Sequence, residues 1–508
     1  MTNDSPENVY AATVGINKGT ATFSDNVLTL AGGTTIALGV AILVTPITSR
    51  LFGPEAFGLA ALFNSGATML GVIACLRYEM AIVLPKKDKD SAQLFALCCI
   101  ALVAMVSLTA VLTVVFGTRA LVYLDAVVLQ PYLWLFPLYV FLEGLQLPLN
   151  YWYTRHKRFK TRSAGRIVSS FSASIAEIAG GLAGFRAGGN LVVIRIFYLF
   201  SFPAYLLWRL SKVEARYIAR NISHSGILKV AKRYRKFPLL DALSMLLGQL
   251  AWYAPIILLS AFFSPTVCGF YAKALYFLYI PSLIVGQSVG QVFLQESAAS
   301  MAEGNNIAGL VEAVLNRMIA IGLFPFALLL IIGPEIFGVF LGARWTEAGV
   351  YVQILTPHLF MVFVLESIMN LFGTLGKQEL NLLTSALYLI LRVGIIVGGG
   401  LLLSDVRLTL FIFMVFNVLF DLWHTLLLLR AAKLSARWPL YHFIRCAVYV
   451  LPSVIPIAAL KWWLGLEAIY LIALTPIFLI PYIVLVLRYD RELYNLFWKY
   501  LQRVRAFV

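Results

Sequence analysis

The hydrophobic positions of this 508-residue chain form long runs separated by short polar breaks. A typical run, from Leu94 to Val115, is apolar on every helical face and lacks the alternation expected of a membrane β-strand. A helix needs about 20 apolar residues to cross the hydrocarbon core of a bilayer. The pattern therefore predicts an all-α polytopic membrane protein.

We predict about fourteen transmembrane helices from these runs, using breaks such as Gly53-Pro54 and Ser264-Pro265 as boundaries. The predicted helices cover residues 26–49, 56–76, 92–116, 127–152, 166–185, 189–209, 238–262, 269–293, 314–340, 347–372, 380–403, 406–429, 440–462 and 467–487.

Composition supports this interpretation. Hydrophobic residues make up 61% of the chain and charged residues 13%, which is about half the charged share of an ordinary soluble domain. The net charge is +16, from 40 Lys and Arg against 24 Asp and Glu. In a soluble protein this excess would suggest nucleic acid as a partner, so the placement of the positive residues matters.

The positive residues are concentrated in alternate loops. With the N-terminus inside, 31 Lys and Arg residues fall in inside segments and six in outside loops. Cytoplasmic loops of membrane proteins carry this excess. The longest basic loop, from Arg209 to Lys236, suits contact with anionic headgroups. We therefore predict cytoplasmic N- and C-termini, a lipid bilayer as partner, and no nucleic acid.

The chain contains five cysteines, and all lie inside or at the ends of apolar runs without metal-ligand spacing. They are interpreted as small apolar residues, and no metal site is predicted. The first 25 residues are polar, without the ordered regions of a signal peptide, so we expect no cleaved leader.

Two segments suggest an internal repeat. Ser49-Arg-Leu-Phe-Gly-Pro-Glu-Ala-Phe-Gly58 and Ser260-Ala-Phe-Phe-Ser-Pro-Thr-Val-Cys-Gly269 share Ser, Phe, Pro and Gly at one constant offset. Both close one predicted helix and open the next in an outside loop. Repeats six helices apart have the same orientation, which predicts two six-helix bundles related by a pseudo-two-fold axis along the membrane normal.

This repeat gives the predicted domain organisation. It comprises a cytoplasmic N-terminal segment (1–25), an N-terminal six-helix bundle (26–210), a basic cytoplasmic loop (211–237), a C-terminal six-helix bundle (238–430), and two extra helices with a cytoplasmic tail (431–508).

Ionisable residues inside membrane helices are costly and mark candidate functional positions. They are Glu143, Glu177, Arg195, Asp241, Lys273, Glu366, Arg392 and Asp421. Arg77 and Glu79 lie at the inner end of the second predicted helix. Glu143 and Glu366 both fall in the fourth helix of a predicted bundle. The alternative interpretation is that each residue pairs with a neighbour or extends to the membrane surface.

Recognised motifs of energy supply and catalysis are missing from the sequence. Gly373-Thr-Leu-Gly-Lys-Gln378 lacks the spacing of an ATP-binding phosphate loop. There is no His-Glu-x-x-His pair and no nucleophile elbow. We therefore predict a transporter, not an enzyme, with no catalytic residue, no cofactor, and protons or sodium as candidate coupling ions.

Several stretches resemble a known family. They are Ser49 to Gly58, Leu76-Arg-Tyr-Glu-Met-Ala-Ile-Val-Leu-Pro85, Asn150-Tyr-Trp-Tyr-Thr-Arg-His-Lys-Arg-Phe159, Phe237 to Gln295, and Phe340-Leu-Gly-Ala-Arg-Trp-Thr-Glu-Ala-Gly349. Together they resemble the polysaccharide flippases, of O-antigen and exopolysaccharide type, in the multidrug, oligosaccharidyl-lipid and polysaccharide exporter superfamily.

The resemblance implies two six-helix bundles around a central cationic cavity. It also implies outward transport of an undecaprenyl-pyrophosphate-linked oligosaccharide in the bacterial inner membrane, with a polysaccharide polymerase and chain-length machinery as candidate partners. On this hypothesis the candidate substrate-binding residues are Arg50, Arg77, Trp252, Tyr271, Lys273 and Arg392. The candidate ion-coupling residues are Glu79, Glu143, Asp241 and Glu366.

Three alternatives stay open. A cation-coupled multidrug antiporter of the same superfamily would more naturally have an acidic, aromatic cavity. A membrane polysaccharide polymerase or ligase would usually carry its chemistry on a long outer loop. A peptidoglycan-precursor flippase would share the mechanism with a different substrate.

Overall fold

The computed structural model describes residues 23–302, 307–369, 371, 378–432, 434 and 437–489. These residues form α-helices joined by short 3-10 and π segments, with no β-strand among them. The chain divides into two compact units, Met1–Gly269 and Phe270–Val508. The predicted cytoplasmic N-terminal segment, up to residue 22, and the predicted tail, from residue 490, lie outside the described residues.

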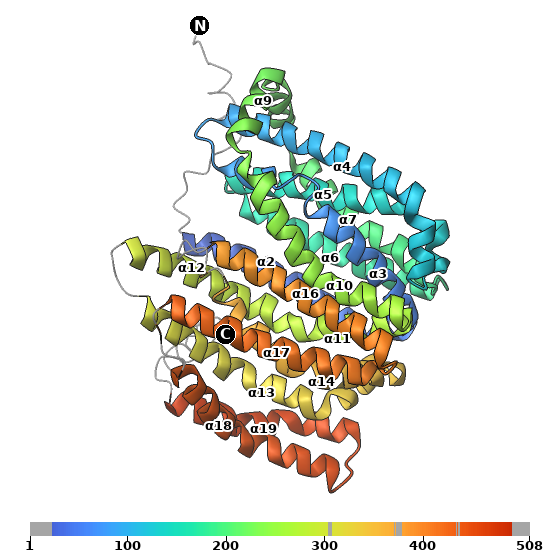
Figure 1. Cartoon of the computed structure of the whole chain (residues 1–508), viewed down its shortest axis with the longest axis vertical. Coiled ribbons are helices and arrows are strands. Elements are labelled where there is room, and N and C mark those ends of the chain that lie inside the picture. Colours follow the sequence, from blue (N-terminus) through green and yellow to red (C-terminus); the bar gives the residue numbers. More distant parts are fainter. Residues whose placement is uncertain are drawn as a thin grey trace, which may run out of the picture. The chain divides into compact units, whose positions relative to one another are not determined.

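Among the described residues, the first unit contains seven long helices and several short ones (Figure 1). They are α2 (Phe23–Leu51), α3 (Pro54–Gly71), η1 (Tyr78–Val83), α4 (Asp88–Tyr123), η2 (Val127–Tyr132), α5 (Leu135–Arg155), α6 (Phe159–Leu182), α7 (Gly188–Arg209), α8 (Lys212–Arg220), α9 (His224–Arg233), η3 (Phe237–Asp241), α10 (Ala242–Phe262) and the first turn of α11 (Pro265–Pro281).

Small residues bring the helices of this unit close together. Helix α3 packs against α5, α7 and α10, and α2 packs along α6. Gly33 of α2 leaves no room for a Cβ beside Ser163 of α6. The Ser170 hydroxyl donates to the Ala37 carbonyl oxygen at 2.7 Å. Close backbone approach with interhelical hydrogen bonds is typical of membrane helix pairs.

The second unit contains the rest of α11 and seven further helices of sixteen residues or more among the described residues. They are η4 (Ser282–Gly286), α12 (Gln287–Ala302), α13 (Ala308–Leu341), η5 (Ala343–Trp345), α14 (Thr346–Glu366), α16 (Gln378–Leu402), α17 (Val406–Ala431), α18 (Arg437–Trp462) and α19 (Ala468–Tyr489). Helix α14 packs on α13 and α17, while α18 and α19 pack on each other and on α13.

Helix α13 bends at Ile332, where φ is −117° and ψ is 26°. Pro334, two residues later, has no backbone N–H. The Leu330 carbonyl oxygen therefore loses the helical hydrogen bond that residue 334 would otherwise donate. Gln353 Nε2 donates instead to the carbonyl oxygens of Leu330, at 2.9 Å, and Ile331, at 3.0 Å. Lys461 Nζ also donates to Ile331 O at 2.7 Å. These contacts satisfy carbonyl groups that a bilayer would leave without partners.

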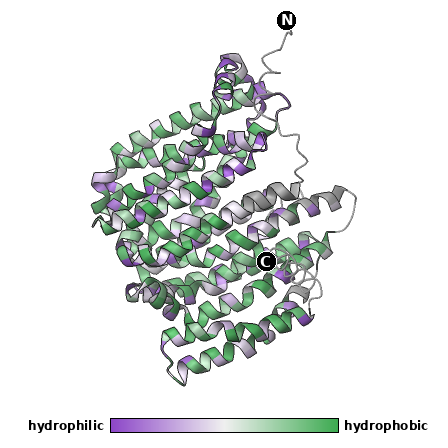
Figure 2. Ribbon diagram, turned by 180° about the vertical axis from the view of Figure 1, so that it is seen from behind, coloured by the Kyte–Doolittle hydropathy of each residue, from purple (hydrophilic) through white to green (hydrophobic). Residues whose placement is uncertain are grey.

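Each of the fourteen predicted segments overlaps a helix, and eleven helices among the described residues are long and apolar enough to cross a membrane. Helices α3, α5 and α6 are not among the eleven. Figure 2 shows apolar residues along the helices of both units. The chain is therefore a multi-pass all-α membrane protein, as predicted, and the count of fourteen spans stays a prediction.

The predicted basic loop 211–237 contains two short helices, α8 and α9, which were not predicted. Ser211 begins α8 with a capping box, accepting from the Glu214 backbone N–H while Glu214 accepts from the backbone N–H of Ser211. Ser223 caps α9 in the same position. The Ser-x-x-Glu spacing was present in the sequence as a helix-start signal.

The two repeat segments contact each other reciprocally within the first unit. Gly58 lies against the Pro265 carbonyl oxygen, and Gly269 lies against that of Pro54, with no room for a Cβ at either glycine. Pro54 corresponds to Pro265 and Gly58 to Gly269 in the predicted repeat. A contact in which each partner repeats the other's role is what a two-fold axis produces.

Candidate functional site

A group of charged side chains lies beside the turn that follows α3. Arg77 Nε donates to Asp241 Oδ2 at 2.8 Å, and Arg77 Nη1 lies 3.5 Å from Glu79 Oε1. Leu76 and Arg77 have φ values of 50° and 63°. Two consecutive non-glycine residues in the left-handed region are uncommon and cost free energy. This turn brings together three residues that were predicted separately as site candidates.

Glu79 lies in η1, between α3 and α4, and its side chain is fully buried. Burial raises its pKa to about 7, an effect that its own backbone hydrogen bond and Arg77 partly oppose. Its second oxygen, Oε2, has no hydrogen-bond partner in the part of the chain that the structure describes. An ionisable group with these properties is a functional candidate because its charge is poised to change.

The second unit holds a buried polar network. Arg392 Nη1 of α16 donates to the Tyr388 hydroxyl at 3.1 Å, and that hydroxyl lies 3.5 Å from Nε2 of His358 in α14. His358 Nδ1 lies 2.7 Å from Asp421 Oδ2 of α17. Arg392 is 0% exposed, His358 1% and Asp421 5%. The network therefore joins three helices through a guanidinium, a tyrosine hydroxyl, an imidazole and a carboxylate.

Aromatic rings surround the Arg392 guanidinium. Its central carbon lies 4.9 Å from the Tyr388 ring centroid and 5.0 Å from that of Phe413. Tyr271 packs edge-on against Phe413, with ring centroids 6.5 Å apart. A cation over ring faces is stabilised without a full ion pair. Of the predicted binding residues, Arg392 and Tyr271 thus share one aromatic neighbour.

Glu143 and Glu366 occupy similar environments in their separate units. Glu143 of α5 packs over Gly71 at the end of α3, and Glu366 of α14 packs over Gly286 of η4. Gln146 donates to Glu143, and the Tyr279 hydroxyl lies 3.4 Å from Glu366 Oε2. Each carboxylate therefore lies over a glycine and beside an uncharged donor.

The remaining predicted residues lie in other environments. Lys273 of α11 is 7% exposed, and its Nζ lies 5.1 Å from the Trp345 ring centroid. Trp252 is half-buried in α10, and Arg50 is exposed at the end of α2. Arg195 pairs with Glu177 at 3.6 Å, which matches the alternative interpretation that helix charges pair with neighbours.

The polysaccharide biosynthesis protein family matches residues 47–350, which is more than half of the chain. The chain belongs to this family. The membership confirms the predicted relationship to polysaccharide exporters, and it covers the Arg77 group, Lys273 and Glu143, whereas Arg392 and Asp421 lie beyond the match. No curated protein sequence matches the chain.

Solved structures share the fold of this polysaccharide biosynthesis protein. Lipid II flippase MurJ, in an inward closed conformation, superposes with a TM-score of 0.69 at 11% identity, over 91% of this chain and 99% of that chain. An inward-facing multidrug resistance MATE family transporter of the MOP superfamily gives 0.62 at 13% identity, over 84% and 99%. A MOP superfamily transporter from Pyrococcus furiosus gives 0.51 at 14% identity, over 83% and 99%. At these identities the likeness establishes the fold alone.

His358 and Tyr388 are the two network residues of this polysaccharide biosynthesis protein that were not predicted from the sequence. The available signal for His358 was a histidine inside a mostly apolar helix, directly after Pro357. The available signal for Tyr388 was its position four residues before Arg392, which places both residues on the same helical face.

Proposed function

We propose that the chain is a flippase that moves an undecaprenyl-pyrophosphate-linked oligosaccharide from the cytoplasmic to the periplasmic leaflet. The observation that carries this proposal is the combination of a polysaccharide biosynthesis family with a MOP transporter fold. One of the structures that share this fold is named a lipid II flippase, which also handles a lipid-linked saccharide. Transport proceeds by alternating access and supplies cell-surface polysaccharide biosynthesis.

Buried cations of the second unit suit a pyrophosphate headgroup. Arg392 and Lys273 lie within helices and over aromatic rings. A pyrophosphate that leaves water needs charge-assisted hydrogen bonds to replace its hydration, and guanidinium and ammonium groups supply them. Aromatic faces such as Tyr271 provide apolar contact for sugar rings. Arg50, Arg77 and Trp252 complete the proposed substrate contacts.

Energy for the cycle comes from an ion gradient on this proposal, without ATP or a bound cofactor. Glu79, Glu143, Asp241 and Glu366 are the proposed coupling residues for protons or sodium. Carboxylates inside membrane proteins commonly serve as proton relays. Glu143 and Glu366 are supported by their matching environments over Gly71 and Gly286.

The proposed location is the bacterial inner membrane, with both termini in the cytoplasm, where the excess of positive loop residues is expected. A polysaccharide polymerase and its chain-length machinery are the proposed partners, because they act on the translocated oligosaccharide.

A cation-coupled multidrug antiporter is the second candidate function, since a MATE transporter shares the fold. Cationic drugs would be repelled by buried arginine, so we place it second.

The proposal is tested by neutralising both buried cations, Lys273→Gln with Arg392→Gln. We expect surface polysaccharide to fall at least tenfold, because the pyrophosphate loses its cationic partners, while membrane abundance of the protein is retained. Arg407→Gln is the matched control, because Arg407, at the start of α17, is exposed and forms an ion pair with Glu347. Normal polysaccharide in the double variant would remove both cations from the site, and drug sensitivity in its place would favour the antiporter.

A further inference from the structure

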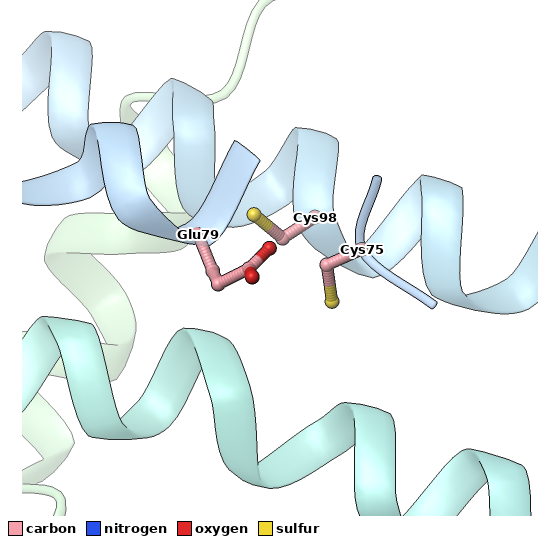
Figure 3. A group of neighbouring side chains, drawn as sticks. All are labelled: Cys75, Glu79 and Cys98. Carbon is pink, nitrogen blue, oxygen red and sulfur yellow. The ribbon is translucent and has the colours of Figure 1, made fainter. Parts of the chain in front are cut away.

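Three buried side chains of types that can ligate a metal ion lie together at α4. Figure 3 shows Cys75, Glu79 and Cys98 as neighbours, with Glu79 and Cys98 pointing toward each other. One thiol or carboxylate atom from each lies within 4.8 Å of the other two. All three residues are 0% exposed. The transport proposal uses only Glu79 of this group, as a coupling residue, and gives no role to either cysteine; the inference below does not depend on that proposal.

The turn after α3 creates the cluster. Helix α3 ends at Gly71, and the left-handed residues Leu76 and Arg77 reverse the chain so that Cys75 and Glu79 lie near each other. Cys98 projects from α4, which packs against η1. The sequence predicts no metal site because Cys75 and Cys98 are far apart along the chain, with no ligand motif around either.

One atom of the cluster is unsatisfied. Glu79 Oε1 faces Arg77, but the fully buried Oε2 has no hydrogen-bond partner among the described residues. A buried carboxylate oxygen without a donor leaves its desolvation cost uncompensated. The Cys75 thiol donates to the Gly144 carbonyl oxygen at 3.6 Å, so it does not donate to Oε2. A cation between the carboxylate and the sulfurs would satisfy Oε2.

We propose that Cys75, Cys98 and Glu79 bind one zinc ion. Thiolate and carboxylate are zinc ligands, and the ligand atoms of a tetrahedral site lie about 3.5–3.8 Å apart, so the cluster needs only a small contraction. A water molecule would complete the four ligands. Both thiols lose their protons to solvent on binding.

Charge balance supports a divalent cation at this position. Two thiolates and one carboxylate around a doubly charged ion leave one negative charge. The Arg77 guanidinium, 3.5 Å from Glu79 and 2.8 Å from Asp241, shares its positive charge between that site and the Asp241 carboxylate. Binding would fasten the turn to α4 and hold Arg77 in position for its 2.8 Å contact with Asp241. The proposed zinc site is therefore structural: it would stabilise a strained turn that carries candidate transport residues.

The test measures zinc in the purified full-length chain, stripped with a chelator under reducing conditions and then dialysed against zinc. We expect about one retained ion per chain by elemental mass spectrometry. The Cys75→Ser, Cys98→Ser double variant should lose it, and Glu79→Gln should bind at least tenfold more weakly. Cys99→Ser is the matched control, because Cys99 neighbours Cys98 on α4 and lies outside the cluster, and it should bind as the wild type does.

A second measurement keeps the inference testable if the double variant does not fold. Cobalt added to the stripped wild-type chain should give a thiolate-to-cobalt charge-transfer band that zinc then abolishes. Absence of this band, zinc content unchanged in a folded double variant, or a Cys75–Cys98 disulfide in peptide mass spectra of the unreduced chain would each overturn the proposal.

Discussion

At the scale of single residues, Asp421 is significant because it accepts from a histidine inside the membrane-spanning part of the chain. The 2.7 Å contact between His358 and Asp421 links α14 to α17, and both side chains are almost fully buried. A buried polar group that loses its partner pays its desolvation cost in full. The pair therefore stabilises the second unit only while both members are present.

Replacing Asp421 with leucine should lower the free energy of unfolding by about 1–3 kcal/mol, because His358 is left buried without its acceptor. Glu347→Gln is the control, since Glu347 pairs with exposed Arg407 and such pairs contribute about 0.2–1 kcal/mol. Denaturant unfolding in detergent micelles measures both. Equal stability of the two variants would show that the His358 contact does not matter.

His156, directly after α5, should make stability depend on pH. Burial is the main cause that lowers its pKa below the ordinary value of 6.5. The unfolded chain then binds more protons than the folded chain in the window below pH 6.5, so stability falls as pH drops through that window.

The measurement is thermal unfolding of the wild type and of His156→Gln between neutral and mildly acidic pH. The variant should lose less stability on acidification than the wild type. His224→Gln, at the exposed start of α9, should behave as the wild type does. A wild type and His156→Gln with parallel pH profiles would refute this role.

Sequence reasoning found the charged members of the site but not which of them pair. Arg77, Asp241 and Arg392 stood out because charges in apolar segments are costly. The pairing of Arg77 with Asp241 joins residues 164 positions apart. Only the packing of α3, η1 and η3 brings them together, and no local pattern encodes that packing. The Cys75 cluster was missed for the same reason.

At the scale of helices, the reciprocal glycine contact is the feature with the clearest consequence. Gly58 and Gly269 each lie against the proline carbonyl oxygen of the other segment. Gly58→Ala or Gly269→Ala should lower stability by about 1–3 kcal/mol, because the added methyl group overpacks a backbone contact. Gly248→Ala in α10 is the control, since nothing lies near its Cβ position, and it should stabilise slightly. Thermal unfolding would contradict the account if all three variants behaved alike.

Hydrophobic runs predicted the position of long helices well because membrane spans have an obligatory length. They did not predict α8 and α9, whose short amphipathic turns are set by the caps at Ser211 and Ser223. Nor did they predict the bend in α13. Proline at 334 was visible, but the partners that satisfy its freed carbonyls, Gln353 and Lys461, come from distant helices.

At the scale of the whole molecule, family membership and fold lead to one account. The chain is a multi-pass protein of a polysaccharide biosynthesis family with the fold of MOP transporters. The excess of Lys and Arg in alternate loops predicts its orientation. We propose that it carries an anionic lipid-linked oligosaccharide outward. The buried cations Arg392 and Lys273 would bind its pyrophosphate.

The most direct test is the side of the membrane on which lipid-linked oligosaccharide is found after conditional depletion of this protein. An impermeant lectin or a periplasmic glycosidase would report the outer leaflet in intact spheroplasts. The account predicts that the glycolipid accumulates on the cytoplasmic side and becomes accessible again when the wild-type chain is restored. Normal outer-leaflet exposure during depletion, with polymerisation or attachment failing instead, would contradict flipping and indicate an enzymatic or assembly role.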